Sequence, residues 1–321
     1  MPTIERVTSV VFAALPLFHA YGLTLSLTFA MSMGSRLVLF PAFDPDLVLD
    51  AVKKRPATFL PAVPPIYERL VQAAGKRKAS LSGIGIAISG AMSLPQTTVE
   101  LWESKTGGYL VEGYGLSECS PVLLANPVGA TRKAGTVGLA LPGTELRVAD
   151  PDDLSADRPF GEEGELLARG PQVFSGYWRQ PEETAGVFAK GGWFRTGDLV
   201  TIDEDGFVSI VDRIKELIIS GGFNIASTEV EDALHGFEGI ADVAVVGLSH
   251  RRRGEDVVAA VVMEAGASFD EEAIRAFARD SLTPYKVPRH VIPVDELPRN
   301  IVGKVIRRKV REELLNRQDE H

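Results

Sequence analysis

The first third of the chain alternates short apolar runs with segments of helical periodicity, and this alternation restricts the fold more than any other feature. Apolar runs of strand length occupy residues 10–18, 36–41, 57–63 and 83–90. Apolar residues recur at helical spacing in residues 44–55, 64–74 and 95–107. Strands that alternate with helices are joined by crossovers, which makes neighbouring strands parallel. The pattern therefore predicts a layered α/β domain, which we assign to residues 1–135.

Two further changes of pattern divide the rest of the chain. From Thr136, short strands separated by Gly, Pro and Asp turns predict a β-rich subdomain over residues 136–212. From Arg213, a hairpin pattern is followed by alternating helices and strands, which predicts a small α+β domain over residues 213–321. The first helix of that domain carries a Thr228-x-x-Glu231 capping-box pattern. The sequence thus predicts an α/β protein of three parts.

Charge, cysteine and histidine content exclude several classes of protein. The net charge of −9 argues against a nucleic-acid-binding protein, whose surface is basic. The five histidines have no metal-ligand spacing. The single cysteine, Cys119, excludes an intrachain disulfide and fits a reducing compartment, so we expect a cytoplasmic location.

Between Arg6 and Arg36 the chain has no Asp, Glu, Lys or Arg, and this run is long enough to cross a bilayer. Pro16, His19 and Gly22 interrupt it, and no small-residue cleavage pattern follows. We therefore expect a buried strand and a core helix here rather than a transmembrane segment.

A basic stretch near the C-terminus, residues 299–311, is an exception in this acidic chain. Ile306, Val310 and Leu314 form an apolar helical stripe, which predicts a solvated face for the remaining arginines, namely Arg307, Arg308 and Arg311. Lys304 differs because it follows Gly303 in the turn before the helix, where its side chain can reach away from the domain. Taken alone, a lysine in this position is more often a surface residue.

The segment 112–121, Glu-Gly-Tyr-Gly-Leu-Ser-Glu-Cys-Ser-Pro, combines groups suited to a nucleotide. Gly113 and Gly115 flank Tyr114, so backbone can approach a flat ligand while the ring stacks on it. Ser117 and Glu118 add a hydroxyl and a carboxylate, which suit Mg²⁺ and phosphate. The alternative is a glycine-rich turn with a capping glutamate.

Two later segments add further candidates. Asp198 follows a Thr-Gly turn, where a carboxylate can accept both hydroxyls of a ribose or simply satisfy its own turn. Arg213 can hold ribose or phosphate oxygens. Gly221 and Gly222 could let backbone lie against a narrow ligand, or only form the hairpin turn.

The order of these motifs strongly resembles that of the adenylate-forming acyl-activating enzymes, and most closely that of a long-chain fatty-acid–CoA ligase. The series is LPLFHAYG, ISGAMSLP, EGYGLSE, WFRTGD, DRIKELIISGGFNI and LPRNIVGK, and the resemblance extends from Leu15 to Arg311. It implies that ATP and a fatty acid give an acyl-adenylate and pyrophosphate. The acyl group then passes to the thiol of coenzyme A, and Mg²⁺ is the implied cofactor.

The resemblance also implies roles for the nucleotide-side residues. Gly90 and Ala91 would line the adenine, and Tyr114 would stack on it beside Gly115. Ser117, where the family more often has threonine, would face phosphate. Glu118 would hold Mg²⁺, which neutralises the phosphates during attack.

Other implied roles concern the ribose, the transferred group and the moving domain. Asp198 and Arg213 would grip the ribose, and Lys304 would bridge the attacking carboxylate and the α-phosphate. Lys215 would be the hinge about which a mobile C-terminal domain swings between half-reactions. His19, Gly221 and Gly222 would lie along the acyl and thiol path, with the apolar run after His19 walling a fatty-acyl tunnel.

One expected motif is absent from the sequence. The family's Ser/Thr/Gly-rich phosphate loop, followed by Pro-Lys-Gly, should precede LPLFHAYG and does not. We therefore expect the C-terminal part of a ligase, the remnant of an adenylating domain, with weak or no activity alone. A missing N-terminal portion, a homo-oligomer and peripheral membrane contact all stay open.

The sequence leaves two alternatives to a fatty-acyl–CoA ligase. One is a relative that activates aryl or short-chain acids, or acids loaded onto a carrier protein. The other is a non-catalytic protein that binds acyl groups or nucleotides.

Overall fold

The computed structural model describes residues 8–301 and 303–319, and these form two compact units. The first unit contains the chain up to Thr196 together with Val200–Ile210, and the second contains Gly197–Leu199 and the chain from Val211 onwards. The expected boundaries at residues 135/136 and 212/213 stay a prediction.

A seven-stranded sheet organises the first unit, in the order β2-β1-β3-β4-β5-β6-β7. Its first five strands in sequence pair in parallel, as the alternating pattern predicts. They are β1 (Val10–Ala13), β2 (Arg36–Leu39), β3 (Ala57–Ala62), β4 (Ile84–Ser89) and β5 (Tyr109–Tyr114). The short strands β6 (Leu124–Ala125) and β7 (Leu139–Ala140) extend the sheet antiparallel. This confirms the layered α/β fold.

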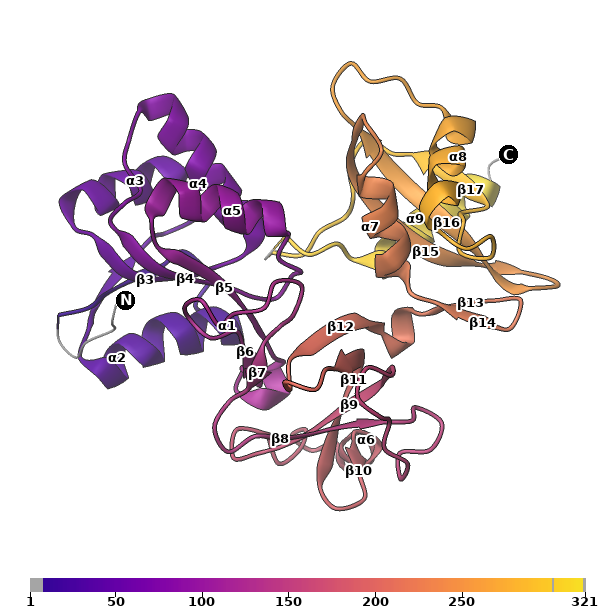
Figure 1. The fold of residues 1–321 in the computed structure, drawn as a ribbon, viewed down its shortest axis with the longest axis horizontal. Helices are drawn as coiled ribbons and strands as arrows, with labels where there is room; N and C mark the ends of the chain where they lie inside the picture. Colours follow the sequence, from indigo (N-terminus) through magenta and orange to yellow (C-terminus); the bar gives the residue numbers. More distant parts are fainter. Residues whose placement is uncertain (1–7, 302, 320–321) are drawn as a thin grey trace. The chain divides into compact units, whose positions relative to one another are not determined.

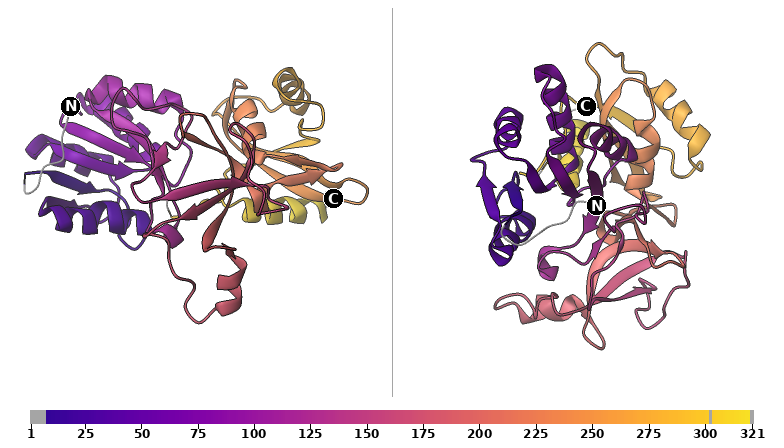
Figure 2. Two further views of the ribbon diagram at one scale, coloured as in Figure 1. Left: turned by 60° about the horizontal axis from the view of Figure 1, so that its bottom comes forward. Right: turned by 60° about the vertical axis from the view of Figure 1, so that its left-hand side comes forward.

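Helices cover both faces of this sheet (Figures 1 and 2). One face carries α3 (Pro45–Lys54), α4 (Pro64–Arg77) and α5 (Gln96–Thr106). The other carries α1 (Ala20–Gly22), the π-helical segment η1 (Leu23–Thr28) and α2 (Phe29–Met33). Asp44 caps α3 by accepting from the amide of Asp46, and proline begins both α3 and α4, where a missing amide donor costs nothing.

The uncharged N-terminal run forms β1, α1, η1 and α2, but its helical part is buried on one side only. Tyr21, Ser26 and Ala30 face the interior, whereas Leu23 and Met31 are 41% and 72% exposed. The prediction of a core helix is therefore wrong for the outward-facing side of this segment, which is exposed. The strand β2 was also expected to be buried, yet Arg36 and Leu39 are exposed because β2 is an edge strand.

Among residues 8–301 and 303–319, no helix is long and apolar enough to cross a membrane.

A second sheet in the order β10-β11-β9-β8, with β12 paired to β11, follows the parallel strands. Its strands are β8 (Glu145–Ala149), β9 (Gly164–Arg169), β10 (Phe188–Ala189), β11 (Trp193–Ile202) and β12 (Val208–Arg213). The helix α6 (Pro181–Gly186) lies in the connection from β9 to β10. The short strands and turns predicted from Thr136 onwards are present.

The sheet of the second unit has the order β14-β13-β16-β15, and β17 pairs with β16 in parallel. Its strands are β13 (Ile218–Ser220), β14 (Phe223–Ile225), β15 (Ile240–His250), β16 (Gly254–Met263) and β17 (His290–Pro293). The predicted hairpin at Gly221 and Gly222 is the β13–β14 turn.

Side chains of β15 and β16 alternate between two cores, as the period of two in a strand requires. Val243 and Val245 pack in a cluster with α7 (Ser227–His235) and α8 (Glu271–Ser281). Ala244 and Val246 pack in another cluster with Val310 and Leu314 of α9 (Arg307–Asp319). Figure 2 shows α9 on the opposite face of the sheet from α7 and α8. Val310 and Leu314 of the predicted apolar stripe are therefore confirmed, whereas Ile306 precedes α9.

The capping box expected at Thr228 and Glu231 does not form. Instead, Asp212 Oδ2 accepts from the Ser227 hydroxyl at 2.9 Å and from the Thr228 amide at 3.3 Å. Glu231 Oε1 accepts from the Val245 amide at 2.8 Å. The first turn of α7 is thus capped by the Asp212 side chain, which comes from β12 and lies next to that turn.

Candidate active site

The residues predicted from the sequence fall into two groups, one in each unit. In the first unit all of them except His19 lie at or after the carboxyl ends of β4 and β5, which are adjacent parallel strands with Ser89 opposite Glu112. This edge is where ligands bind in open α/β sheets. The parallel topology therefore places the Gly90–Ala91 turn beside the Tyr114–Glu118 segment.

Close backbone approach explains the small residues of this edge. A side-chain carbon on Gly115 would lie 1.8 Å from the Pro121 carbonyl oxygen, so no larger residue fits. One on Gly90 would lie 3.3 Å from the Gly113 carbonyl oxygen and from the Tyr21 ring. Ala91 has a positive φ of 65°, an uncommon conformation for alanine that marks a tight turn.

Tyr21 connects this turn to the N-terminal helix and was missed in the sequence. Its hydroxyl donates to the carbonyls of Ile88, at 2.6 Å, and Ala62, at 3.2 Å. His19 caps the same helix, because its Nδ1 accepts from the Tyr21 amide at 3.2 Å. His19, which was predicted to lie along the acyl path, is therefore held next to Tyr21, whose ring lies close to Gly90.

Glu118 lies in the short 3₁₀ helix η2 (Ser117–Cys119), and its carboxylate has a partner that the sequence did not suggest. Glu118 Oε1 accepts from the Tyr177 hydroxyl at 2.8 Å, and its carbonyl accepts from the Phe174 amide at 2.7 Å. Burial and this hydrogen bond raise the pKa of Tyr177 to about 12, so it stays a donor at neutral pH. Ser117 is exposed at the start of the same turn.

The oxygen donors of Ser117 and Glu118 are of the kind that can hold a magnesium ion together with a bound nucleotide. Within the described part of the chain, no group of three or more His, Cys, Asp or Glu side chains could hold a metal by itself. Mg²⁺ commonly uses one or two carboxylates together with substrate phosphates and water. Glu118 and the Ser117 hydroxyl are oxygen donors of that kind.

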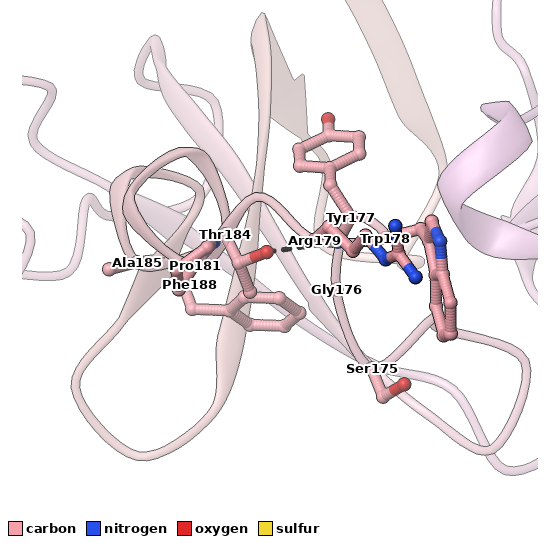
Figure 3. Close-up of a pocket in the computed structure, with 9 residues that line it drawn as sticks. All are labelled: Ser175, Gly176, Tyr177, Trp178, Arg179, Pro181, Thr184, Ala185 and Phe188. Carbon is pink, nitrogen blue, oxygen red and sulfur yellow. Dashed lines mark hydrogen bonds between the residues drawn. The ribbon is translucent and has the colours of Figure 1, made fainter.

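An open pocket of about 450 Å³ lies in the loop that carries Tyr177 (Figure 3). Thr184 Oγ1 accepts from the Tyr177 amide at 2.9 Å and donates to the Gln180 carbonyl at 2.8 Å. Figure 3 shows the Tyr177 hydroxyl directed away from Thr184 and Phe188. This loop fixes the tyrosine that contacts Glu118, and its pocket is lined by residues between Ser175 and Phe188.

Glu112 is a further unpredicted member of this edge. Its carboxylate is half-buried on β5 and accepts from the Leu94 backbone amide. Burial raises its pKa to about 8. A carboxyl group that stays protonated near neutral pH beside a candidate ligand edge is a feature that sequence pattern alone does not reveal.

In the second unit, Asp198 and Arg213 are in direct contact. Arg213 Nε lies 2.8 Å from Asp198 Oδ1, and Asp198 is only 2% exposed. The two residues assigned to one ribose therefore lie side by side, on the strands β11 and β12.

Lys304 lies in a tight turn that begins at Arg299. The Asn300 amide donates to the Lys304 carbonyl at 2.8 Å, and the Lys304 amide donates to Asn300 Oδ1 at 2.9 Å. Gly303 supplies the positive φ of 88° that this turn needs. Burial, followed by the charge of Arg213, lowers the pKa of Lys304, while Glu216 and Asp198 oppose the shift. The turn thus brings the ammonium group into the field of the Asp198–Arg213 pair.

The remaining predicted residues lie on the hinge and hairpin. Lys215 is the middle residue of the 3₁₀ turn η3 (Ile214–Glu216), directly after β12. Gly221 and Gly222 have positive φ values of 60° and 85°, and a side-chain carbon on either would meet no described atom within 4 Å. The backbone of this exposed turn is therefore open on the side where a side chain would project.

Arg307 corrects the expectation of a solvated arginine face. It is 18% exposed and forms ion pairs with Glu231 and Glu216. Arg308, by contrast, is 81% exposed. The helical pattern distinguished apolar from polar positions, but it could not show which arginine meets the partly buried carboxylates of Glu231 and Glu216.

Comparison with known proteins agrees with these observations. Residues 2–178 match the model of the AMP-binding enzyme family, and residues 229–304 match the AMP-binding enzyme C-terminal domain. A long-chain-fatty-acid–CoA ligase from Bacillus subtilis is 42% identical over 303 residues, which is 94% of this chain and 54% of that protein. A feruloyl-CoA synthase from Amycolatopsis is 37% identical over 93% of this chain and 60% of that protein.

A solved structure shows the same fold. ATP-bound MatB from Rhodopseudomonas palustris superimposes with a TM-score of 0.89 at 38% identity, over 95% of this chain and 60% of that one. The chain spans about half the length of the curated relatives that it matches. The sequence motifs, the fold and these matches together show that the chain belongs to the AMP-binding enzyme family.

Proposed function

We propose that this chain carries residues for the ATP-dependent activation of a fatty acid and its transfer to coenzyme A. The observation that supports this most directly is the contact between Asp198 and Arg213 with Lys304 in their field. A paired carboxylate and guanidinium suit a ribose, and a nearby ammonium suits charge that develops at an α-phosphate. ATP, a fatty acid and coenzyme A are the proposed substrates, and the proposed location is the cytoplasm.

In the first half-reaction, an oxygen of the fatty-acid carboxylate attacks the α-phosphorus of ATP and pyrophosphate leaves. Lys304 would stabilise the negative charge shared by the incoming oxygen and the α-phosphate. Mg²⁺, held through Glu118, would neutralise the phosphate charge. Gly90, Ala91 and Tyr114 would hold the adenine.

In the second half-reaction, the thiolate of coenzyme A attacks the acyl carbonyl carbon and AMP leaves. We propose that rotation about Lys215 withdraws Lys304 and brings the Gly221–Gly222 turn toward the pantetheine arm. The open backbone at these glycines supports this role. His19 would lie between the acyl group and the thiol path.

Replacement of Lys304 tests this function. In the full polypeptide that contains these residues, Lys304→Ala should lower ATP–pyrophosphate exchange by about 10²–10³-fold, the usual effect of losing one charge-stabilising donor. Thioester formation from supplied acyl-adenylate should persist. Lys309→Ala is the matched control, since Lys309 is an exposed lysine on the same segment. An equal loss of both half-reactions would refute the role given to Lys304.

An aryl acid is a second candidate substrate, because one relative is named a feruloyl-CoA synthase. Pyrophosphate exchange measured over a panel of fatty, short-chain and aryl acids separates the two. We expect long-chain acids to give the highest kcat/KM, and a preference for aryl acids would reverse the assignment.

A further inference from the structure

We propose that Arg307 is a positioning residue that ties the Lys304 turn, the η3 hinge turn and α7 into one rigid ionic cluster. The functional meaning of this cluster rests on the role proposed for Lys304. Arg307 is the first residue of α9 and follows Lys304 by three positions. Contacts that fix Arg307 therefore restrain the chain close to the turn that carries the lysine.

The contacts of Arg307 reach two elements that are distant in sequence. Its Nε lies 3.1 Å from Glu231 Oε1 and its Nη2 lies 2.6 Å from Glu231 Oε2, a two-point contact that fixes the plane of the guanidinium. Its Nη1 donates to Glu216 Oε2. Glu216 is the last residue of η3, directly after Lys215. One side chain thus joins the hinge turn to α7.

The cluster is also attached to the sheet of the second unit. Glu231 Oε1 accepts from the Val245 amide of β15 at 2.8 Å. On the other side of the lysine, Arg299 pairs with Asp242 of the same strand and donates to the Gly303 carbonyl. The Lys304 turn is therefore held at both ends, by Arg299 before it and by Arg307 after it.

Burial makes the ion pair between Arg307 and Glu231 costly to break. The side chains of Arg307 and Glu231 are 18% and 13% exposed, so removing one partner leaves a largely buried charge without compensation. The charges also act on Lys304 with opposite signs: Arg307 lowers the pKa of Lys304, and Glu216 raises it. Replacing either residue therefore has a measurable and opposite effect on the lysine.

The test measures Lys304 directly in the folded 321-residue chain, without relying on turnover. Competitive acetylation with acetic anhydride across pH, followed by mass spectrometry, gives the apparent pKa of Lys304. Arg307→Gln should raise that pKa, because a nearby positive charge is removed. Glu216→Gln should lower it. Arg308→Gln, at an exposed neighbouring position, should leave it unchanged.

Unfolding would move the pKa of Lys304 toward its ordinary value in every variant. Opposite pKa shifts in Arg307→Gln and Glu216→Gln therefore distinguish a positioning role from a loss of structure. Hydrogen exchange of the amides at residues 303–305 should accelerate roughly tenfold in Arg307→Gln and not in Arg308→Gln. If Arg307→Gln does not fold, Glu216→Gln still tests the hinge contact. Unchanged exchange, or equal shifts for Glu216→Gln and Arg308→Gln, would overturn the inference.

Activity in the full polypeptide supplies a second readout. Arg307→Gln should lower kcat of adenylation about tenfold or more while the KM for ATP changes less than about threefold, because the lysine is misplaced but the ribose contacts remain. Arg307→Lys, which keeps the charge but not the two-point contact, should recover part of kcat. The proposed function can fail in the Lys304→Ala assay while the labelling result stands, so the two failures are distinguishable.

Discussion

At the scale of single residues, burial decides the chemistry of Glu112. The carboxyl group lies on β5, where burial raises the cost of ionising it, and the Leu94 amide only partly offsets that cost. Its pKa of about 8 in the folded chain lies above the ordinary 4.5 of an exposed glutamate. Between these values the unfolded chain releases its proton first, so this residue destabilises the fold as pH rises.

Glu112→Gln should therefore flatten the pH dependence of stability. Below about pH 4.5 the wild-type residue is neutral in both states and the variant should be similar to it. The advantage of the variant should grow through pH 5 to 8 toward roughly 3–5 kcal/mol, an upper bound from 1.36 kcal/mol per pKa unit. Urea unfolding at a series of pH values measures this. Glu100→Gln, at an exposed position on α5, is the control, and a parallel change in both variants would contradict the argument.

Gly115 provides a steric prediction in the same segment. Gly115→Ala places a methyl group against the Pro121 carbonyl and should cost roughly 1–3 kcal/mol or more, as overpacking does. Gly113→Ala is the matched control two residues away, because its added carbon would lie 3.4 Å from the nearest atom. Thermal unfolding compares the two, and equal losses would show that the Pro121 contact is not decisive.

At the scale of elements, α7 depends on a residue outside the helix. Asp212→Ala removes the acceptor for the Thr228 amide and for the fully buried Ser227 hydroxyl. Loss of the cap and an unsatisfied buried hydroxyl should together destabilise the second unit by about 2–4 kcal/mol. Thr228→Ala should change the free energy of unfolding by less than about 0.5 kcal/mol, since no capping box forms.

Hydrogen exchange of the amides in the first turn of α7 locates this effect. We expect Asp212→Ala to expose them and Thr228→Ala to leave them protected. If Thr228→Ala lost more exchange protection than Asp212→Ala, the capping box predicted from the sequence would be the correct description.

At the scale of the whole molecule, each unit has its own core. The second unit packs apolar side chains on both faces of its sheet, with α7 and α8 on one face and α9 on the other. A fragment from Gly197 to the C-terminus contains this entire unit, so we expect it to unfold in one cooperative urea transition. A gradual, non-cooperative loss of circular dichroism would show that its core needs the rest of the chain.

Sequence periodicity by itself determined most elements of this protein. The parallel strands β1, β2, β3 and β4, the helices between them and the β13–β14 hairpin were predicted, because spacing of apolar residues and turn residues acts locally. The strand β5 was not predicted. The ordered motifs also identified Asp198 and Arg213, whose contact the fold then produced. Their roles, and that of Lys304, stay predictions.

Only the tertiary structure decided which polar groups meet. Arg307 and Glu216 are 91 residues apart in the chain, and Tyr177 and Glu118 are 59 apart. Asp212, not Thr228, caps α7 because the path of the chain after β12 brings it there. Local patterns record whether a side chain is apolar or charged. The partner of a buried charge depends on how distant elements pack, and no local pattern contains that information.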